Sequence, residues 1–426
     1  MKSYLSASQM ELRNEYNQIK EQYGEFCKSS LKLDMSRGKP GADQLDLIEG
    51  MLTVLAGNQD CYTRNGWDCR NYGLVDGIPE AKALFAELIG VQESELIVMG
   101  NSSLNIMYDT MADAMLFGVN GKEPWCKQGT IKFLCPAPGY DRHFTLCETF
   151  GIEMIPVKMN ADGPDMDQVE QLASSDASIK GIWCVPKYSN PTGITYSDEV
   201  VRRFASLKTA AEDFCIYWDN AYLIHDLNAE TEPLLDLLAA CKQQGTENRV
   251  FMFASTSKIT FPGAGVALFA ASETNIARRK KKLCAQTIGH DKLNQLRHVK
   301  YFGCASGVKE HMQKQAAILR PKFDCVLKTL KAELGDKGIA SWHHPKGGYF
   351  ISLDVYENTA RRTWELAKNA GVTLTNAGAT FPYNQDPRDC NLRIAPTYPS
   401  NEELQTAIRI LCCCVRLSAL EKLLQA

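Results

Sequence analysis

The most specific chemical signal in the sequence is a lysine set among hydroxyl side chains. Lys258 follows a short apolar run, Val250–Ala254, and precedes a glycine-rich turn at Gly263–Gly265. A lysine at the carboxyl end of a buried strand, beside hydroxyls and free backbone N–H groups, suits Schiff-base chemistry next to a phosphate. Partial burial would help, because it lowers the pKa of an amine that must lose its charge. Taken alone, the segment also fits a surface lysine in a serine- and glycine-rich turn.

Other polar segments accompany this lysine at the ends of apolar runs. They are Gly100–Asn105, the N-P-T-G sequence Asn190–Gly193, and the D-N-A-Y sequence Asp219–Tyr222. In a parallel sheet the carboxyl ends of the strands share one edge, where doubly wound folds bind their ligands. An isolated N-P-T-G turn or strand-ending aspartate often has no chemical role, but the segments in this order favour one shared site.

The elements that must position these residues are seven short apolar runs, bounded by proline, glycine, asparagine or aspartate. They lie at Leu96–Met99, Ile131–Cys135, Ile152–Val157, Gly181–Val185, Phe214–Trp218, Val250–Ala254 and Val266–Ala270. Runs of this kind suit strands buried on both faces of a parallel sheet. Amphipathic segments such as Ser197–Ala211 lie between them, with Ser197 placed to cap the first helical turn. The alternation predicts an α/β fold with a mainly parallel, seven-stranded sheet sandwiched by helices.

The pattern changes from His311 onward. A long helical stretch is followed by strand-like runs and a last helix, at His311–Leu334, Tyr349–Leu353, Val372–Thr375, Leu392–Ala395 and from Asn401. We therefore predict a large domain at 56–310 and a smaller α+β domain at 311–426. Near the N-terminus an apolar helical stripe is formed by Leu12, Tyr16, Ile19, Tyr23 and Phe26. We expect this helix and the following arm, residues 1–55, to belong to the small domain rather than to contact a partner.

The composition argues against several classes of function. The 47 Lys and Arg residues against 50 Asp and Glu give a net charge of −3, which does not favour nucleic-acid binding. The basic run Arg278–Lys282 is typical of a solvated helix face. No apolar run approaches the ~18 residues of a membrane span. The 16 cysteines, with no apolar signal segment near Met1, indicate reduced thiols in the cytoplasm. Since consecutive helical residues such as Cys412–Cys414 point about 100° apart, we expect no metal site.

Together these motifs resemble fold type I pyridoxal-phosphate enzymes of the aspartate aminotransferase superfamily. The resemblance runs from Leu33 to the C-terminus and rests on Ser36–Pro40, Asn71–Glu80, Asn190–Gly193, Asp219–Tyr222, Ser255–Lys258 and Asn391–Ala395. The form of the motifs looks most like subgroup Ic, whose domain also occurs in MocR-type regulators. The resemblance implies pyridoxal 5′-phosphate bound to the large domain, and transfer of an amino group from an L-amino acid to a 2-oxo acid. Aspartate and 2-oxoglutarate are favoured by the subgroup alone.

The resemblance also implies roles for the residues around the cofactor ring. Lys258 would form the Schiff base and then carry a proton between the substrate and the cofactor. Asp219 would pair with the pyridinium nitrogen, while Tyr222 and Asn190 would donate hydrogen bonds to the O3′ atom. Tyr140 resembles the aromatic residue that stacks on the ring, although it also fits a core aromatic after a turn.

Phosphate binding is implied at the start of one helix and in the turn before the lysine. The implied residues are Asn101, Ser102, Ser103, Ser255 and Ser257, because free N–H groups at a helix N-terminus favour an anion. Tyr72 resembles the tyrosine that reaches the phosphate of a neighbouring subunit, which implies a homodimer with shared active sites. Many relatives carry an arginine where this sequence has Gly263–Gly265, so the cation beside the phosphate is open.

Substrate binding is implied at Arg393, which matches the arginine that clamps the α-carboxylate, a bidentate task for which arginine is suited. Asn190 and the segment around Gly38 are implied at the same place. A dicarboxylic substrate needs a second cation for its side chain. The candidates are Arg37, Lys39, Arg64 and Arg70.

Other functions on the same scaffold stay open. A transaminase of broader specificity would act on alanine, 2-aminoadipate or aromatic amino acids. A C–S lyase or other β-eliminating enzyme would use the same lysine and aspartate. A ligand-sensing domain without catalysis is the third alternative, although the stretch ahead of Ser36 is too short for the DNA-binding module of MocR-type regulators.

Overall fold

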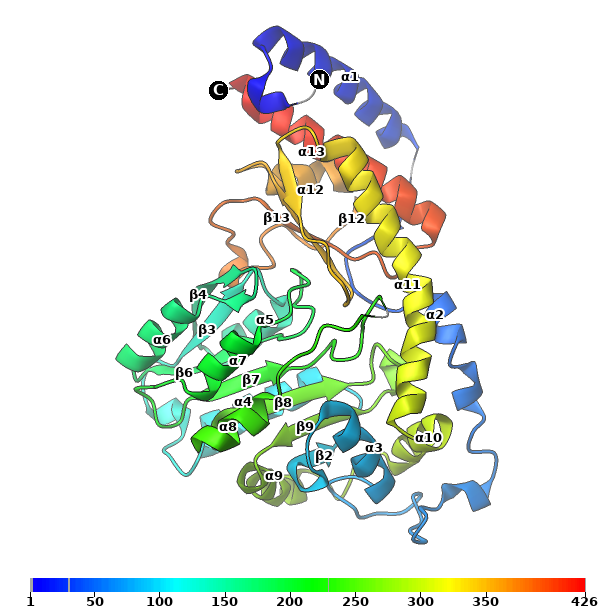
Figure 1. The fold of residues 1–426 in the computed structure, drawn as a ribbon, viewed down its shortest axis with the longest axis vertical. Helices are drawn as coiled ribbons and strands as arrows, with labels where there is room; N and C mark the ends of the chain where they lie inside the picture. The colour runs from blue at the N-terminus through cyan, green and yellow to red at the C-terminus, as the bar shows by residue number, and fades with distance from the viewer. Residues whose placement is uncertain (1–2, 30, 229, 426) are drawn as a thin grey trace.

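The computed structural model describes residues 3–29, 31–228 and 230–425, and shows a large and a small body side by side (Figure 1). An 8-stranded sheet forms the centre of the large body, and a 3-stranded sheet lies in the small one. One long helix, α11 (Ala305–Leu334), runs along both bodies. Both ends of the described chain lie at the outer end of the small body, far from the large sheet.

The large sheet is parallel over most of its width. Its strands lie in the order β2 (Leu96–Val98), β9 (Ala267–Ala271), β8 (Val250–Ser255), β7 (Cys215–Asp219), β6 (Ile179–Cys184), β3 (Lys132–Ala137), β4 (Glu153–Asn160) and β5 (Gly163–Pro164). Neighbours from β8 to β4 are parallel, whereas β9 runs antiparallel to both of its neighbours. All seven predicted runs are strands, so the predicted α/β fold is confirmed. The short edge strand β5 is an addition that no sequence pattern indicated.

Helices cover both faces of this sheet, as predicted. One face carries α3 (Pro79–Ile89), α6 (Met166–Ser175), α7 (Asp198–Ala205), α8 (Leu237–Gln244) and α10 (Lys292–Phe302). The other face carries α4 (Ser103–Phe117), α5 (Asp141–Thr149) and α9 (Glu273–Gln286). Successive strand residues such as Ile182 and Trp183 pack into opposite cores. Because both faces are buried, the strands show continuous apolar runs instead of alternation.

The small body combines the two ends of the chain. Its strands are β10 (Ala340–Trp342), β11 (Ile351–Val355) and β13 (Asn391–Ile394) in one sheet, and β1 (Leu33–Asp34) paired with β12 (Val372–Thr373). Its helices are α1 (Gln9–Lys28), α12 (Ala360–Asn369) and α13 (Asn401–Gln425). Helix α1 packs along α13, with Leu12 and Ile19 buried in their shared core. The apolar stripe thus faces α13, while the assignment of residues 1–55 to the small domain stays a prediction.

The boundary between the bodies is not a single point in the chain. Ile48 and Met51 pack in the core of the large sheet, although they precede residue 56. They follow a short helix, α2 (Ala42–Asp46), that leads from the small body toward the large one. The division into 1–55, 56–310 and 311–426 stays a prediction.

The helix expected at Ser197–Ala211 is shorter than predicted. Ser197 caps it as expected, accepting a hydrogen bond from the Val200 N–H at 3.3 Å, but α7 ends at Ala205. Beyond that point the Ala210 N–H donates to the Ala173 carbonyl at 2.8 Å. The chain is thus drawn toward α6, and a tertiary hydrogen bond replaces further helical turns.

The basic run Arg278–Lys282 in α9 is only partly a solvated face, so that interpretation was wrong for its second residue. Arg279 is buried and forms ion pairs with Asp113 at 2.6 Å and Asp109 at 3.1 Å, both on α4. These contacts join two helices on the same face of the sheet, which gives the run a structural role.

Two absences apply to the described part of the chain. No helix there is long and apolar enough to cross a membrane. No group of three or more His, Cys, Asp or Glu side chains within residues 3–29, 31–228 and 230–425 is arranged to hold a metal ion.

Candidate active site

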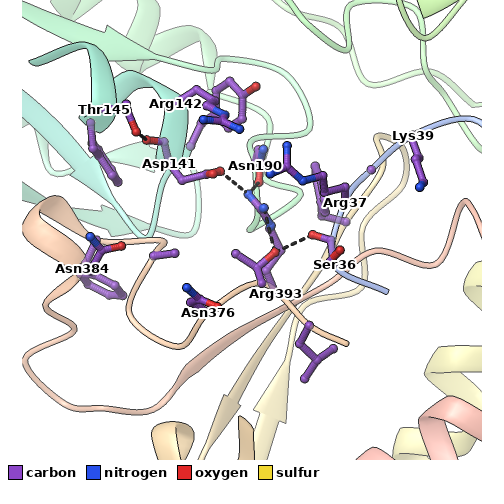
Figure 2. A pocket seen from close by; sticks show the side chains of 18 of the residues that line it. Ser36, Arg37, Lys39, Asp141, Arg142, Thr145, Asn190, Asn376, Asn384 and Arg393 are labelled. Atoms are coloured by element: carbon purple, nitrogen blue, oxygen red, sulfur yellow. Dashed lines mark hydrogen bonds and ion pairs between the residues drawn. The ribbon is translucent and has the colours of Figure 1, made fainter. Parts of the chain in front are cut away.

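The carboxyl ends of the parallel strands open into a pocket of about 570 Å³ between the two bodies (Figure 2). Its lining includes many of the predicted site residues, namely Gly38, Tyr140, Asn190, Tyr222, Lys258 and Arg393. Gly38 and Arg393 come from the small body, and the other four residues follow strands of the large sheet. The pocket is therefore built from segments that lie far apart in the sequence.

Lys258 lies in the turn after β8, with its amine inside the pocket. Its Nζ atom is 4.9 Å from the ring centre of Tyr222 and 6.0 Å from that of Tyr349. Burial lowers the pKa of the amine, and the negative charge of Asp219 partly opposes this shift. The amine therefore loses its proton more readily than an exposed lysine does, as nucleophilic attack on a carbonyl requires.

Asp219 ends the central strand β7 as a buried carboxylate with one oxygen held and one free. Its Oδ2 atom lies 3.1 Å from Nε2 of His143, whose ring stacks on Trp183 at 4.2 Å. Its Oδ1 atom is buried and has no hydrogen-bond partner among the described residues. A buried oxygen left unpaired costs free energy, so this atom is suited to accept a hydrogen bond from a ligand.

His143 was missed by the sequence analysis. It stands three residues after Tyr140 in α5, so the two side chains share one side of the helix start. The ring of Tyr140 packs edge-on against it at 4.9 Å and an angle of 78°. Burial raises the pKa of Tyr140 to about 12. Tyr140 thus lines the pocket and packs in the interior at once, so its predicted role and its alternative are compatible.

Tyr222 and Asn190 both have hydrogen-bond donors available in the pocket. Burial raises the pKa of Tyr222 well above its ordinary value, so its hydroxyl keeps its proton. The side-chain oxygen of Asn190 accepts from Nη1 of Arg393 at 3.3 Å. That contact leaves the amide N–H groups of Asn190 free to donate.

The predicted phosphate residues are joined by hydrogen bonds at the start of α4. Ser257 Oγ donates to the Asn101 carbonyl at 3.4 Å, and Ser255 Oγ donates to Ser257 Oγ at 3.0 Å. Ser102 is the N-cap of α4, and Ser103 is its first residue. The structure thus places these residues around one helix N-terminus, which favours an anion.

In the turn after Lys258, which lacks the arginine of many relatives, packing disfavours a side chain at Gly265 but not at Gly263, where a Cβ atom would meet nothing within 4 Å. A Cβ atom at Gly265 would lie 3.0 Å from Thr256 Oγ1 and 3.5 Å from the Ser257 nitrogen. A side chain there would crowd the turn that carries the hydroxyls. Beneath it, burial lowers the pKa of His298 to about 4, so this imidazole is neutral at pH 7 and is not the replacement cation.

Tyr72 is the predicted site residue that this single chain does not bring to the others. Its side chain is 76% exposed and does not line the pocket. Because its implied role concerns the phosphate site of a second subunit, that role stays a prediction.

The arginine implied in substrate binding is held at the small-body side of the pocket. The buried guanidinium of Arg393 donates to Thr375 at 2.9 Å and to Asp141 at 2.8 Å. It also lies over the ring of Phe350, 4.7 Å from the ring centre. A Cβ atom at Gly38 would meet this ring at 2.5 Å. Glycine at this position therefore lets the Ser36–Pro40 segment approach Phe350 and Arg393.

The structure separates the candidates for a second substrate-binding cation. Arg37 and Lys39 line the pocket, whereas Arg64 and Arg70 do not. A further pocket arginine, Arg142, was missed by the sequence analysis and lines the same pocket as Asp141 and Asn190 (Figure 2). Its position directly after the Tyr140-Asp141 pair was the only signal available. Neither Arg37 nor Arg142 forms an ion pair within the part of the chain that the structure describes.

A buried polar network supports the backbone next to Lys258, and the sequence gave no sign of it. Its members are Gln44, His311, Gln315 and Tyr349. His311 Nε2 donates to the Ile259 carbonyl at 2.8 Å, and the Tyr349 hydroxyl donates to the Lys258 carbonyl at 3.4 Å. Gln44 donates to both Tyr349 and Gln315. The network thus links α2 and α11 to the turn that carries the reactive amine.

Known proteins resemble this chain over nearly its whole length. The family model described as aspartate amino-transferase matches residues 7–426. An aspartate aminotransferase of Corynebacterium glutamicum is 46% identical over 407 residues, which cover 95% of this chain and 94% of that protein.

Solved structures agree with the sequence comparisons. The crystal structure of an aspartate transaminase from Corynebacterium glutamicum has a TM-score of 0.95 at 45% identity, with 97% of both chains covered. The α-aminoadipate aminotransferase of Thermus thermophilus, solved with N-(5′-phosphopyridoxyl)-L-leucine, has a TM-score of 0.75 at 19% identity. That comparison covers 92% of this chain and 93% of the other, and it shows a shared fold.

The lowered pKa of Lys258 leads to a pH prediction. In the cofactor-free protein, methylation by formaldehyde and borohydride should modify Lys258 with an apparent pKa below the ordinary value of 10.5. Asp219→Asn should lower that pKa further, because the carboxylate stabilises the charged amine. Mass spectrometry of the modified peptide over a pH series measures both values. An apparent pKa at or above 10.5 in the wild-type protein would contradict the assignment.

Proposed function

The chain belongs to the aspartate aminotransferase family, and from that premise we propose that it uses pyridoxal 5′-phosphate to transfer the amino group of L-aspartate to 2-oxoglutarate. The observation that carries this proposal is a pocket lined by a neutralisable amine and a carboxylate-binding guanidinium, with a half-satisfied carboxylate buried behind the lining and acting on the charge of the amine. These groups belong to Lys258, Arg393 and Asp219. Similarity of the motifs to subgroup Ic supports placing the chain there.

The residues present fit pyridoxal 5′-phosphate. The unpaired Oδ1 of Asp219 suits the protonated ring nitrogen, and the amine of Lys258 suits the aldehyde carbon. The helix start at Ser102, with the hydroxyls of Ser255 and Ser257, suits the phosphate. When bound, the cofactor supplies an aldehyde and an electron-accepting ring.

The residues around the cofactor divide the work of proton transfer. Asp219 keeps a proton on the ring nitrogen, because its Oδ1 atom has no other described donor to pair with. The amine of Lys258, once free, would carry a proton from the substrate Cα atom to the aldehyde carbon of the cofactor in the first half of the reaction, and in the reverse direction in the second half. Tyr222 and Asn190 would donate hydrogen bonds to the ring oxygen. The network at the Lys258 and Ile259 carbonyls fixes the backbone from which the amine moves.

The pocket offers a cation for each of the two carboxylates of a dicarboxylic substrate. Arg393 would hold the α-carboxylate, because its guanidinium is buried and fixed by Thr375 and Phe350. Arg37 and Arg142 line the same pocket without ion pairs to described residues. A carboxylate on the substrate side chain would give one or both of them a charged partner.

A homodimer and a cytoplasmic location are parts of the same proposal. Trp67, Tyr72 and Ile288 are exposed to 48%, 76% and 63%. They lie on two segments that touch, since a Cβ atom at Gly289 would meet the Gly73 carbonyl oxygen at 2.5 Å. Exposed apolar side chains gathered in this way mark protein contacts. The 16 free cysteines support a reducing compartment.

The proposed dimer can be tested by measuring the mass of the protein in solution. Light scattering of the purified protein should give twice the chain mass of 47.4 kDa. A mass of one chain at micromolar concentration would remove the shared active site from the proposal.

Substrate choice is tested by removing the free cations one at a time. Wild-type protein should form oxaloacetate from aspartate only when 2-oxoglutarate is present, and should prefer aspartate to alanine. Arg142→Gln and Arg37→Gln should be assayed separately. At least one should lower kcat/KM for aspartate by about 10- to 100-fold, because a charge-assisted contact is lost. Its kcat/KM for alanine should stay within about twofold, since alanine has no second carboxylate.

Arg361→Gln is the matched control, because Arg361 is exposed on α12 and lies outside the pocket. It should leave both amino acids unaffected. Equal losses for aspartate and alanine in both pocket variants would contradict a dicarboxylate site. Catalytic release of pyruvate and ammonia from an amino acid with a leaving group on Cβ, such as cysteine, without any 2-oxo acid would replace transamination by β-elimination.

A further inference from the structure

The guanidinium proposed to bind the substrate already binds a carboxylate of the protein. Nη1 of Arg393 donates to Oδ1 of Asp141 at 2.8 Å, and the two side chains point toward each other across the pocket (Figure 2). Arg393 stands on β13 of the small body, and Asp141 is the first residue of α5 in the large body. The ion pair therefore joins the two bodies at the place where a substrate would bind.

The donors of Arg393 are almost fully engaged by the protein. Nη1 is shared between Asp141 and Asn190, Nη2 donates to Thr375, and the buried Nε atom has no partner among the described residues. A bidentate carboxylate needs two parallel N–H groups on one edge of the guanidinium. Asp141 occupies Nη1, one of the two nitrogens of the Nη1–Nη2 edge. A substrate α-carboxylate cannot take that edge while the Asp141 carboxylate stays in place.

Asp141 is well placed to leave. Its side chain is 30% exposed, whereas that of Arg393 is 5% exposed. The Asp141 carboxylate makes no other hydrogen bond or ion pair with a described side chain. A partly solvated carboxylate regains water when it moves away, so the exchange costs less than the breaking of a fully buried pair.

We propose that Asp141 is an internal ligand of Arg393, displaced by the α-carboxylate of the substrate, and that this exchange sets substrate affinity. The inference rests on the proposed function, in which Arg393 binds that carboxylate. In the empty pocket Asp141 neutralises a buried guanidinium that would otherwise attract any anion. During turnover it competes with bound acids and so favours their release. A ligand without a carboxylate cannot displace it, so the exchange favours ligands that carry a carboxylate, as amino acids and 2-oxo acids do.

The first test measures binding without reaction. Succinate, a dicarboxylate without an amino group, is titrated into the cofactor-loaded enzyme by calorimetry. Asp141→Asn and Asp141→Ala should lower its Kd by on the order of tenfold, because the competing charge is gone. The KM for aspartate should also be lower in these two variants than in the wild-type enzyme. Asp141→Glu, which keeps the charge, should stay near the wild-type value, and circular dichroism should show the same fold for all variants.

Glu148→Gln provides the matched control. Glu148 lines the same pocket and stands on the same helix, but it makes no contact with Arg393. The substitution removes the same charge and should change the Kd by no more than about twofold, as expected for a screened, distant charge. Equal gains in Asp141→Asn and Glu148→Gln would overturn the proposal, because the pocket charge alone would explain them.

Arg393→Gln separates the failure of this inference from the failure of the proposed function. If it abolishes succinate binding while Asp141→Asn binds no better than wild type, the internal-ligand proposal is wrong and the role of Arg393 stands. If it binds succinate as well as wild type does, the proposed carboxylate site is itself wrong.

Discussion

A buried carboxylate with one oxygen held and one free is the interaction on which the active site depends. Asp219 lies at the end of the central strand β7, and His143 holds its Oδ2 atom at 3.1 Å. Taking such a group out of water costs several kcal/mol unless partners compensate it. The histidine supplies one partner, and the free Oδ1 atom leaves room for one more. The interior is thus suited to hold a ligand that brings an N–H group, and the parallel sheet delivers the other site residues to the same edge.

The positive charge of Arg393 is stabilised differently from the negative charge of Asp219. Arg393 comes from the small body and is satisfied by the protein on nearly every side, including the carboxylate of Asp141. Asp219 has a free oxygen until a cofactor binds, whereas both Nη atoms of Arg393 have protein partners, one of which a substrate would replace. The cofactor site is therefore permanent within the large body, and the substrate site depends on contacts between the two bodies.

Local patterns were enough to predict the strands and the residues at their ends. Lys258 and Asp219 stand directly after apolar runs, so their shared edge follows from the parallel sheet. Local patterns did not predict hydrogen bonds between residues that are far apart in the sequence. Gln44 donates to Gln315, which lies 271 positions later. The role of His143 becomes visible only in the fold, where α5 brings it to Asp219 at the end of β7. The early end of the helix after Ser197 has the same origin, because tertiary contacts set it. Sequence patterns indicate burial and local turns, but not which distant polar side chains form hydrogen bonds with each other.

The most direct test of this account is the protonation state of the bound cofactor. Pyridoxal 5′-phosphate labelled with ¹⁵N in its ring should be loaded into the wild-type protein and into Asp219→Asn, and the ring nitrogen observed by NMR. The account predicts a protonated nitrogen in the wild-type protein near pH 8 and a neutral one in the variant. A neutral nitrogen in the wild-type protein, or a protonated one in both, would contradict the role of the free Asp219 oxygen.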